Sequence, residues 1–263
     1  MEQYKQEVSK YGKKDAVIAL CFYLVLTIFA IVFWVVVDHF ELPGRMSSII
    51  YSILAVVSVV ALVLINKQGI SSLGIHSKNW KPALLLGVVL SVTVLLTMGG
   101  LIVGIIYGSQ FNPLNHIIMM LLYLLIMAAY EDIIFIGYIQ TRLYGLIKKD
   151  VLAVIAGAFL FALIHIPMGL ATGGALWTLL MGMPFWIIMH IIMNGIFRRY
   201  TSIIPVTMFH MFFNFSQTEL WSAEGFVELP SYMVIILVLA LALVLVATLI
   251  VIPKINKFTS QTF

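Results

Sequence analysis

Between Met119 and Ile139 the sequence reads MMLLYLLIMAAYEDIIFIGYI, which places two carboxylates, Glu131 and Asp132, inside an otherwise apolar run. The remaining Asp and Glu residues lie near the chain ends or in short segments between apolar runs. An ionisable group within hydrocarbon costs about 2.5–3.5 kcal/mol on insertion scales, so it is rarely retained without a use. The acidic pair therefore predicts a functional site within the membrane.

The composition is that of a membrane protein. The chain of 263 residues is 62% hydrophobic and 10% charged, whereas a soluble domain carries roughly 25% charge. Spanning a bilayer requires about 20 apolar residues, and helices satisfy their own backbone groups there. We therefore predict an all-α polytopic membrane protein, a bundle of eight transmembrane helices that forms one membrane domain over residues 1–263. The predicted spans are 16–37, 47–65, 82–106, 115–140, 151–168, 175–197, 201–218 and 231–252.

The distribution of basic residues predicts the orientation. If the N-terminus is cytoplasmic and the spans alternate, every Lys and Arg except Arg45 falls on the cytoplasmic side. This bias follows the positive-inside rule and predicts that both termini are cytoplasmic, in a membrane that we expect to be bacterial. The bases sit at helix ends and form no continuous face, so nucleic acid is not an expected partner.

Two other apolar runs carry histidines in motifs with helical spacing. Phe161 and His165 occur in FALIH, and His210 and Asn214 occur in HMFFN. Residues four apart share a helix face. At about 1.5 Å per residue, Glu131, His165 and Asn214 each lie roughly 20–22 Å from the predicted cytoplasmic loops. We therefore expect side chains from three helices to meet at one depth.

A second H-x-x-x-N pair, His190 and Asn194, lies in FWIIMHIIMN. These residues are only about 12 and 6 Å along the helix from Arg198, so their depth matches less well. We therefore favour His210 and Asn214 for the site.

These side chains suit peptide-bond hydrolysis. A carboxylate and an imidazole can activate water, and a second imidazole with an amide can stabilise an oxyanion. Glu131 and Asp132 are about 100° apart on a helix, so one acts and the other supports it. Two His and one Glu are also a zinc ligand set, so zinc on Glu131, His165 and His210 is an alternative to a metal-free site.

Other interpretations remain for the same residues. A single buried His often binds a carbonyl of a neighbouring helix, and Phe161 alone suits packing. A buried acid also suits a proton relay in a transporter. The absence of a recognisable inverted repeat in the sequence weighs against a transporter.

The three motifs, in this order, resemble the CAAX protease and bacteriocin-processing family, also called type II CAAX prenyl endopeptidases or Abi proteins. The family pattern is E-E-x-x-x-R, F-x-x-x-H and H-x-x-x-N, and the resemblance covers roughly residues 70–216. It implies a glutamate-dependent intramembrane protease without a cofactor. Glu131 with His165 would activate water, His210 and Asn214 would form the oxyanion hole, and Asp132 and Phe161 would be supporting residues. The implied substrate is a peptide or membrane protein, and the implied roles include bacteriocin immunity and peptide processing.

Two positions depart from the family pattern. Asp132 stands for the second Glu, and Ile136 stands for the Arg that would counter a buried carboxylate pair. Arg142 follows six residues later, and we expect its side chain to extend to the membrane interface. The uncharged Ile136 supports an alternative function, a catalytically impaired scaffold, regulator or immunity protein that uses the same fold to bind a partner.

Overall fold

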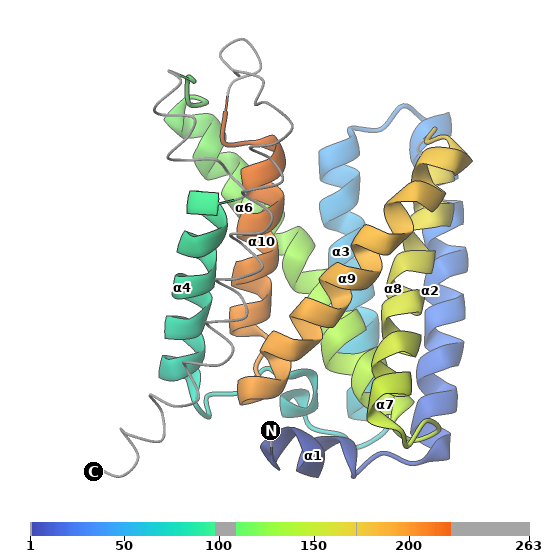
Figure 1. The fold of residues 1–263 in the computed structure, drawn as a ribbon. Helices are drawn as coiled ribbons and strands as arrows, with labels where there is room; N and C mark the ends of the chain where they lie inside the picture. Colours follow the sequence, from blue (N-terminus) through green and yellow to red (C-terminus); the bar gives the residue numbers. More distant parts are fainter. Residues whose placement is uncertain (1, 98–108, 172, 222–263) are drawn as a thin grey trace, which may run out of the picture. The chain divides into compact units, whose positions relative to one another are not determined.

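A computed structural model describes residues 2–97, 109–171 and 173–221, and the regular elements in these ranges are helices (Figure 1). Within these ranges, six helical segments are long and apolar enough to cross a membrane. The prediction of an all-helical integral membrane protein is therefore confirmed. The six candidate spans are Lys13–His39, Gly44–Ile65, Trp80–Thr97, Leu114–Leu143, Asp150–Ala171 and Leu176–Tyr200.

The other two predicted spans have different outcomes. The window 201–218 corresponds to helix α10, Ile204–Thr218, which has 15 residues. At 1.5 Å per residue, α10 is about 22 Å long, shorter than a hydrocarbon core of about 30 Å. The window 231–252 lies outside the described residues. Eight spans therefore stay a prediction, with six supported by the structure.

The chain divides into two compact units. The first unit comprises Met1–Asn79 and Ala129–Val206. The second unit comprises Trp80–Ala128 and Thr207–Phe263, of which the structure describes the portions up to residue 97, from 109 to 128 and from 207 to 221. The acidic pair and His165 therefore belong to the first unit, and His210 and Asn214 belong to the second.

Most of the helices that the structure describes belong to the first unit. A short helix, α1 (Glu2–Val8), precedes the long α2 (Lys13–His39) and α3 (Gly44–Ile65), and a 3₁₀ turn, η1, follows. The bounds of the remaining elements are Ile70–Leu73 for η1, Asp132–Gln140 for η2, Thr141–Leu143 for α7, Asp150–Ala171 for α8 and Leu176–Tyr200 for α9.

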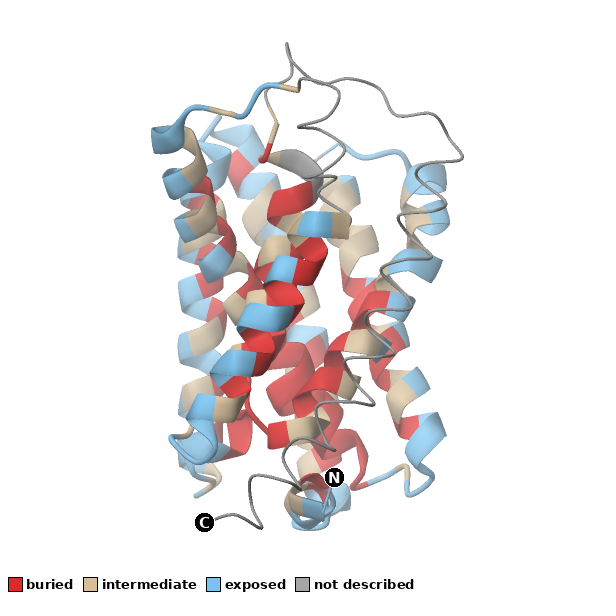
Figure 2. Cartoon of the chain, turned by 60° about the vertical axis from the view of Figure 1, so that its left-hand side comes forward, coloured by how far each residue is buried: buried red, intermediate tan, exposed pale blue. Residues whose placement is uncertain are grey.

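Small residues let these helices approach closely. On α2, Ala16, Ala19 and Ala30 are fully buried, while Leu24 and Val25 are exposed. No hydrophobic force drives helices together within a membrane, so small residues at their contacts allow the close packing that holds them. Figure 2 shows buried residues along one side of the helices and exposed residues on other sides. The exposed apolar side chains of α2 thus suit contact with lipid.

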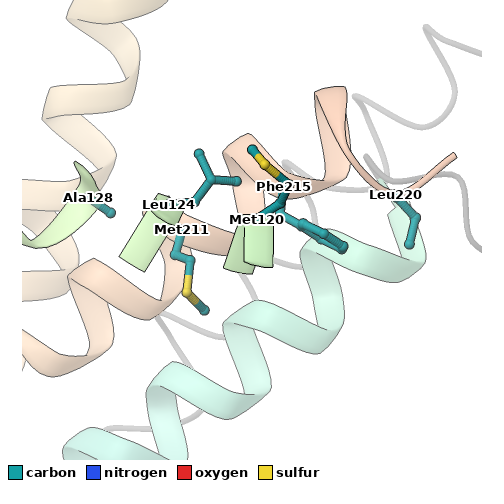
Figure 3. Close-up of a cluster of buried hydrophobic side chains, with 6 residues drawn as sticks. All are labelled: Met120, Leu124, Ala128, Met211, Phe215 and Leu220. Atoms are coloured by element: carbon teal, nitrogen blue, oxygen red, sulfur yellow. The ribbon is translucent and has the colours of Figure 1, made fainter. Parts of the chain in front are cut away.

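The second unit is built on α4 (Trp80–Thr97), α6 (Leu114–Glu131, up to Ala128) and α10 from Thr207 onward. Its buried cluster takes residues at helical spacing from α6 and α10, together with Leu220, which follows α10 (Figure 3). The cluster consists of Met120, Leu124, Ala128, Met211, Phe215 and Leu220.

Polar groups join the end of α10 to the start of α6. The amide of Asn112 donates to the carbonyl oxygens of Glu219 (3.0 Å) and Trp221 (2.9 Å). His116 Nε2 lies 2.7 Å from the Glu219 carboxylate, and the rings of Phe111 and Trp221 stack at 4.6 Å. The segment before α6 and the segment after α10 are thus held side by side.

Candidate functional site

The acidic pair lies where the backbone changes from α- to π-helix. Glu131 is the last residue of α6, and Asp132 is the first residue of the nine-residue π-helix η2. An α-helix was expected through residue 140. π-Helices form i→i+5 hydrogen bonds, occur mostly as single turns, and are frequent at functional sites. Nine consecutive π-helical residues directly after Glu131 therefore set this part of the helix apart.

The two acids have different surroundings. Asp132 is 1% exposed, and Glu131 is half-buried. The buried phenol of Tyr51 on α3 is close enough to Glu131 for an electrostatic interaction. The Tyr51 ring also meets the Tyr130 ring edge-on at 5.8 Å. Of the two carboxylates, Glu131 is therefore the more accessible, and Asp132 is enclosed by the protein.

His165 is oriented by its own helix and by α9. Its Nδ1 lies 2.7 Å from the carbonyl oxygen of Phe161. A carbonyl oxygen only accepts, so Nδ1 carries the proton, and in the neutral ring Nε2 has the lone pair. The imidazole stacks on Trp186 of α9 with ring centroids 4.5 Å apart. The ring is thus fixed with a basic nitrogen at Nε2, as activation of water requires.

Phe161 connects the two motif segments of the first unit. Its ring meets Phe135 of the π-helix at 5.3 Å and His165 of α8 at 4.8 Å. It also lies 5.3 Å from the ring of His190 on α9. Phe161 therefore packs the acid-bearing segment against the histidine-bearing helix, which is the contact that a supporting residue would make.

The second H-x-x-x-N pair is part of a buried polar cluster. His190 and Asn194 are 0% and 1% exposed, and Gln140 of the π-helix is 0% exposed. The Gln140 amide donates to the carbonyl of Ala153 (3.1 Å), so its oxygen faces His190 Nε2 at 3.0 Å. The His190 Nε2–H therefore donates to Gln140. This bond ties α9 to the π-helix, a structural role that the sequence did not reveal.

His210 and Asn214 lie one turn apart on α10 in the second unit. His210 is 6% exposed and Asn214 is half-buried. The structure therefore places Glu131, Asp132, Phe161 and His165 in one unit and this pair in the other. That Glu131, His165, His210 and Asn214 meet at one site stays a prediction.

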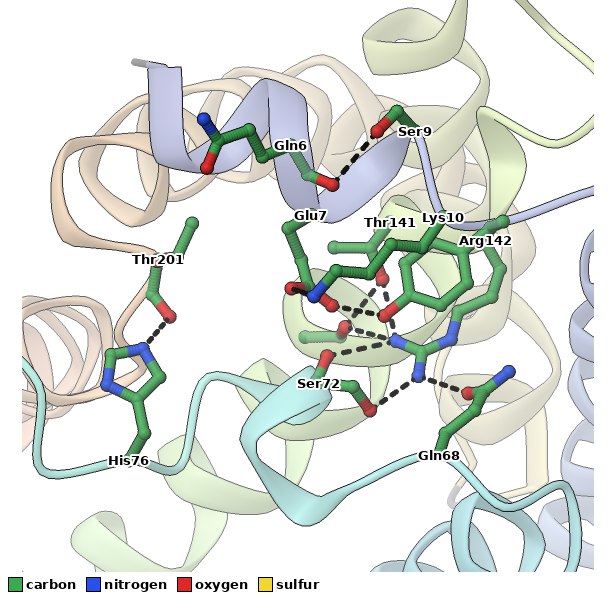
Figure 4. A network of polar contacts seen from close by, with 12 residues as sticks. Gln6, Glu7, Ser9, Lys10, Gln68, Ser72, His76, Thr141, Arg142 and Thr201 are labelled. Carbon is green, nitrogen blue, oxygen red and sulfur yellow. Dashed lines mark hydrogen bonds and ion pairs between the residues drawn. The ribbon is translucent and has the colours of Figure 1, made fainter.

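Arg142 does not extend to the membrane interface as we expected. It is 0% exposed, and its guanidinium is surrounded by hydrogen-bond acceptors within the first unit (Figure 4). The prediction was wrong because Arg142 donates to Gln68 and Ser72 inside the protein. These acceptors lie about seventy positions earlier in the chain, so the sequence around Arg142 does not indicate them. Ile136, which stands for the family Arg, is also 0% exposed.

The described residues contain no group of three or more His, Cys, Asp and Glu side chains that could hold a metal ion. The zinc alternative depends on His210 meeting Glu131 and His165. Zinc therefore stays an alternative to the metal-free site.

The fold and the motifs define a class: an all-helical integral membrane protein with the motif set of a membrane protease. A comparison with protein families agrees. Residues 113–216 match the family model described as Rce1-like, type II CAAX prenyl endopeptidase Rce1-like. The match identifies this segment as Rce1-like and confirms the resemblance predicted from its motifs, all of which it contains. No individual curated protein matches the chain.

Proposed function

We propose that the protein is a glutamate-dependent intramembrane endopeptidase that hydrolyses a peptide bond in a peptide or membrane-protein substrate. The observation that carries this proposal is the Rce1-like match over the segment that holds all three motifs. The orientation of His165 supports it, because hydrogen bonding of Nδ1 to Phe161 leaves Nε2 as a proton acceptor.

In this mechanism, Glu131 and His165 Nε2 accept hydrogen bonds from one water molecule. As the water oxygen attacks the scissile carbonyl carbon, its proton passes to the Glu131 carboxylate. The resulting oxyanion accepts hydrogen bonds from His210 and Asn214. The carbon–nitrogen bond then breaks, and the amine leaves with the proton that Glu131 held. Asp132, which is enclosed by the protein, is the residue that supports Glu131.

The orientation of the protein and its biological role are part of the same proposal. Cytoplasmic termini would place the basic helix ends inside the cell. Processing of an exported peptide, or immunity to a bacteriocin, would suit a peptidase in a bacterial membrane. A prenylated CAAX peptide is a second substrate class, which the name of the matching family suggests.

Comparative peptidomics tests the enzyme. Membranes with wild-type protein are compared with membranes that carry Glu131→Gln, His165→Ala or His210→Ala at equal expression, with and without an added farnesylated CAAX peptide. We expect a defined set of peptide products that all three variants abolish. His190→Gln is the matched control, because it keeps an N–H donor for Gln140 and should retain the products.

A catalytically impaired scaffold is the second candidate, favoured by the buried, uncharged Ile136. A scaffold would keep its partner and its cellular effect in all three variants, and that result would refute the peptidase. Elemental analysis of purified protein decides the metal question separately. Stoichiometric zinc that is lost in His165→Ala would replace the metal-free mechanism.

A further inference from the structure

The guanidinium of Arg142 binds the segment between α3 and α4. Its Nη1 donates to the carbonyl oxygen of Ser72 at 3.0 Å, and its Nη2 donates to Ser72 Oγ at 2.8 Å. Nη2 also donates to Gln68 Oε1 at 2.6 Å. Figure 4 shows these acceptors on one side of the guanidinium. Arg142 thus fixes η1 and the residues that precede it.

The same guanidinium binds the π-helix. Nη1 donates to the carbonyl oxygen of Gly137 at 2.9 Å and to Thr141 Oγ1 at 2.8 Å. The Thr141 hydroxyl also donates to the Gly137 oxygen, at 2.7 Å. A Cβ on Gly137 would lie 2.5 Å from the Leu73 carbonyl oxygen, so η1 presses directly on the π-helix at this point. Arg142 therefore joins η1 to the middle of the segment that begins with Asp132.

Two tyrosines hold the guanidinium from other directions. It lies 4.3 Å from the ring of Tyr11, in the N-terminal segment, and 4.5 Å from the ring of Tyr138, on the π-helix. Burial raises the pKa of the Tyr11 phenol, which stays protonated and donates to the Glu7 carboxylate. Cation–π contacts of this kind strengthen when they are desolvated. The N-terminal segment, the segment between α3 and α4 and the π-helix are distant from one another in sequence. All three thus contact Arg142.

This arrangement has a consequence for the acidic pair. A π-helix is a rare conformation, and rare conformations persist only where their surroundings over-determine them. Arg142 supplies a planar fork of donors to acceptors on two segments at once, which the single ammonium of a lysine cannot reproduce. We propose that Arg142 is a positioning residue that holds the π-helix in register and thereby aims Glu131 and Asp132. Its effect on catalysis rests on the proposed function.

The test compares two lysine substitutions in the full-length protein in nanodiscs. Arg142→Lys removes the fork. Arg198→Lys is the matched control, because Arg198 is also stacked on a tyrosine, Tyr4, and also loses a guanidinium fork, which pairs with Asp150 outside residues 132–140. One readout is deuterium exchange of the amides of residues 132–140, and the other is formation of the Glu131-dependent peptides per folded molecule.

We expect Arg142→Lys to speed exchange in residues 132–140 by roughly tenfold or more, because local opening controls exchange. We expect its kcat to fall roughly 10- to 100-fold with little change in KM, as for a misplaced catalytic group. Arg198→Lys should leave both values unchanged. A residue needed only for folding would lower the yield and keep the rate per folded molecule, and that result would overturn the proposal.

The two proposals fail in distinguishable ways. Without Glu131-dependent products in the wild type, the proposed function falls, and the exchange measurement alone decides whether Arg142 holds the π-helix. If Arg142→Lys exchanges its amides at the wild-type rate and has the wild-type kcat, the positioning role is overturned while the peptidase stands. If Arg142→Lys does not fold, Ser72→Ala and Gln68→Leu remove one acceptor each, and the same readouts decide the outcome.

Discussion

Gly157 lies where α8 passes against two polar side chains of the first unit. A Cβ at this position would lie 2.0 Å from Gln140 Oε1 and 3.1 Å from His190 Nε2. The hydrogen bond between Gln140 and His190 therefore depends on the absence of a side chain at residue 157. A bond between buried groups leaves both of them unsatisfied when it breaks.

Gly157→Ala should separate Gln140 from His190 and lower the free energy of unfolding by about 1–3 kcal/mol, the cost of unsatisfied buried polar groups. Denaturant unfolding in bicelles measures the change. Gly195→Ala is the control, because a Cβ there meets nothing within 4 Å, and alanine is favoured over glycine in a helix by up to about 1 kcal/mol. Equal stability of the two variants would contradict this role for Gly157.

Some single residues could be recognised from the sequence and others could not. Glu131 and Asp132 stood out because a carboxylate in an apolar run is costly wherever its helix packs. Gln140 and Arg142 gave no such signal. Their roles depend on His190, Ser72 and other residues far along the chain, and spacing within one helix carries no information about those partners.

At the scale of elements, the π-helix is the main departure from expectation. The apolar run between residues 115 and 140 fixed the existence and length of a helix, because hydropathy depends on composition. It did not distinguish i→i+4 from i→i+5 hydrogen bonding, because every residue of η2 is buried and no polar face marks its period. The i→i+5 pattern follows from the contacts of Gly137 with η1 and Arg142. These are tertiary contacts, which hydropathy does not report.

The ends of α6 and α10 offer a test of element pairing in the second unit. Asn112→Ala removes two hydrogen bonds to carbonyl oxygens, which should lower the free energy of unfolding by about 1–2 kcal/mol. Thermal unfolding measures it. Ser48→Ala removes an exposed bond within α3 and should change the stability by less than about 0.5 kcal/mol. A stability of Asn112→Ala as high as that of Ser48→Ala would contradict the pairing.

At the scale of the whole molecule, the sequence predicted an all-helical membrane protein from composition, and the structure confirms it. The convergence of the site could not be predicted to the same degree. Matching depths along separate helices constrain one coordinate, whereas a site also requires the helices to be neighbours with the right faces turned inward. For Phe161 and Phe135 the structure supplies that contact.

The predicted orientation can be tested with cysteine labelling. Cys21 is the single cysteine, so Cys21→Ala gives a background in which Arg45→Cys or Lys148→Cys is introduced, both at exposed positions. A membrane-impermeant maleimide should label the cysteine at residue 45 in intact cells and the one at residue 148 only after permeabilisation, as the positive-inside rule expects. The reverse pattern would invert the orientation.

The contact between Tyr11 and Arg142 also bears on how the protein is made. Tyr11 leaves the ribosome roughly 130 residues before Arg142, a delay of about 7–26 s at about 5–20 residues per second. During that interval the N-terminal segment has no guanidinium to stack on, and Gly12 lacks the backbone of Gly145 against which it finally rests. Tyr11 and Gly12 therefore dock only after residues 142–145 have been made, and a chaperone or the insertion machinery can occupy them meanwhile.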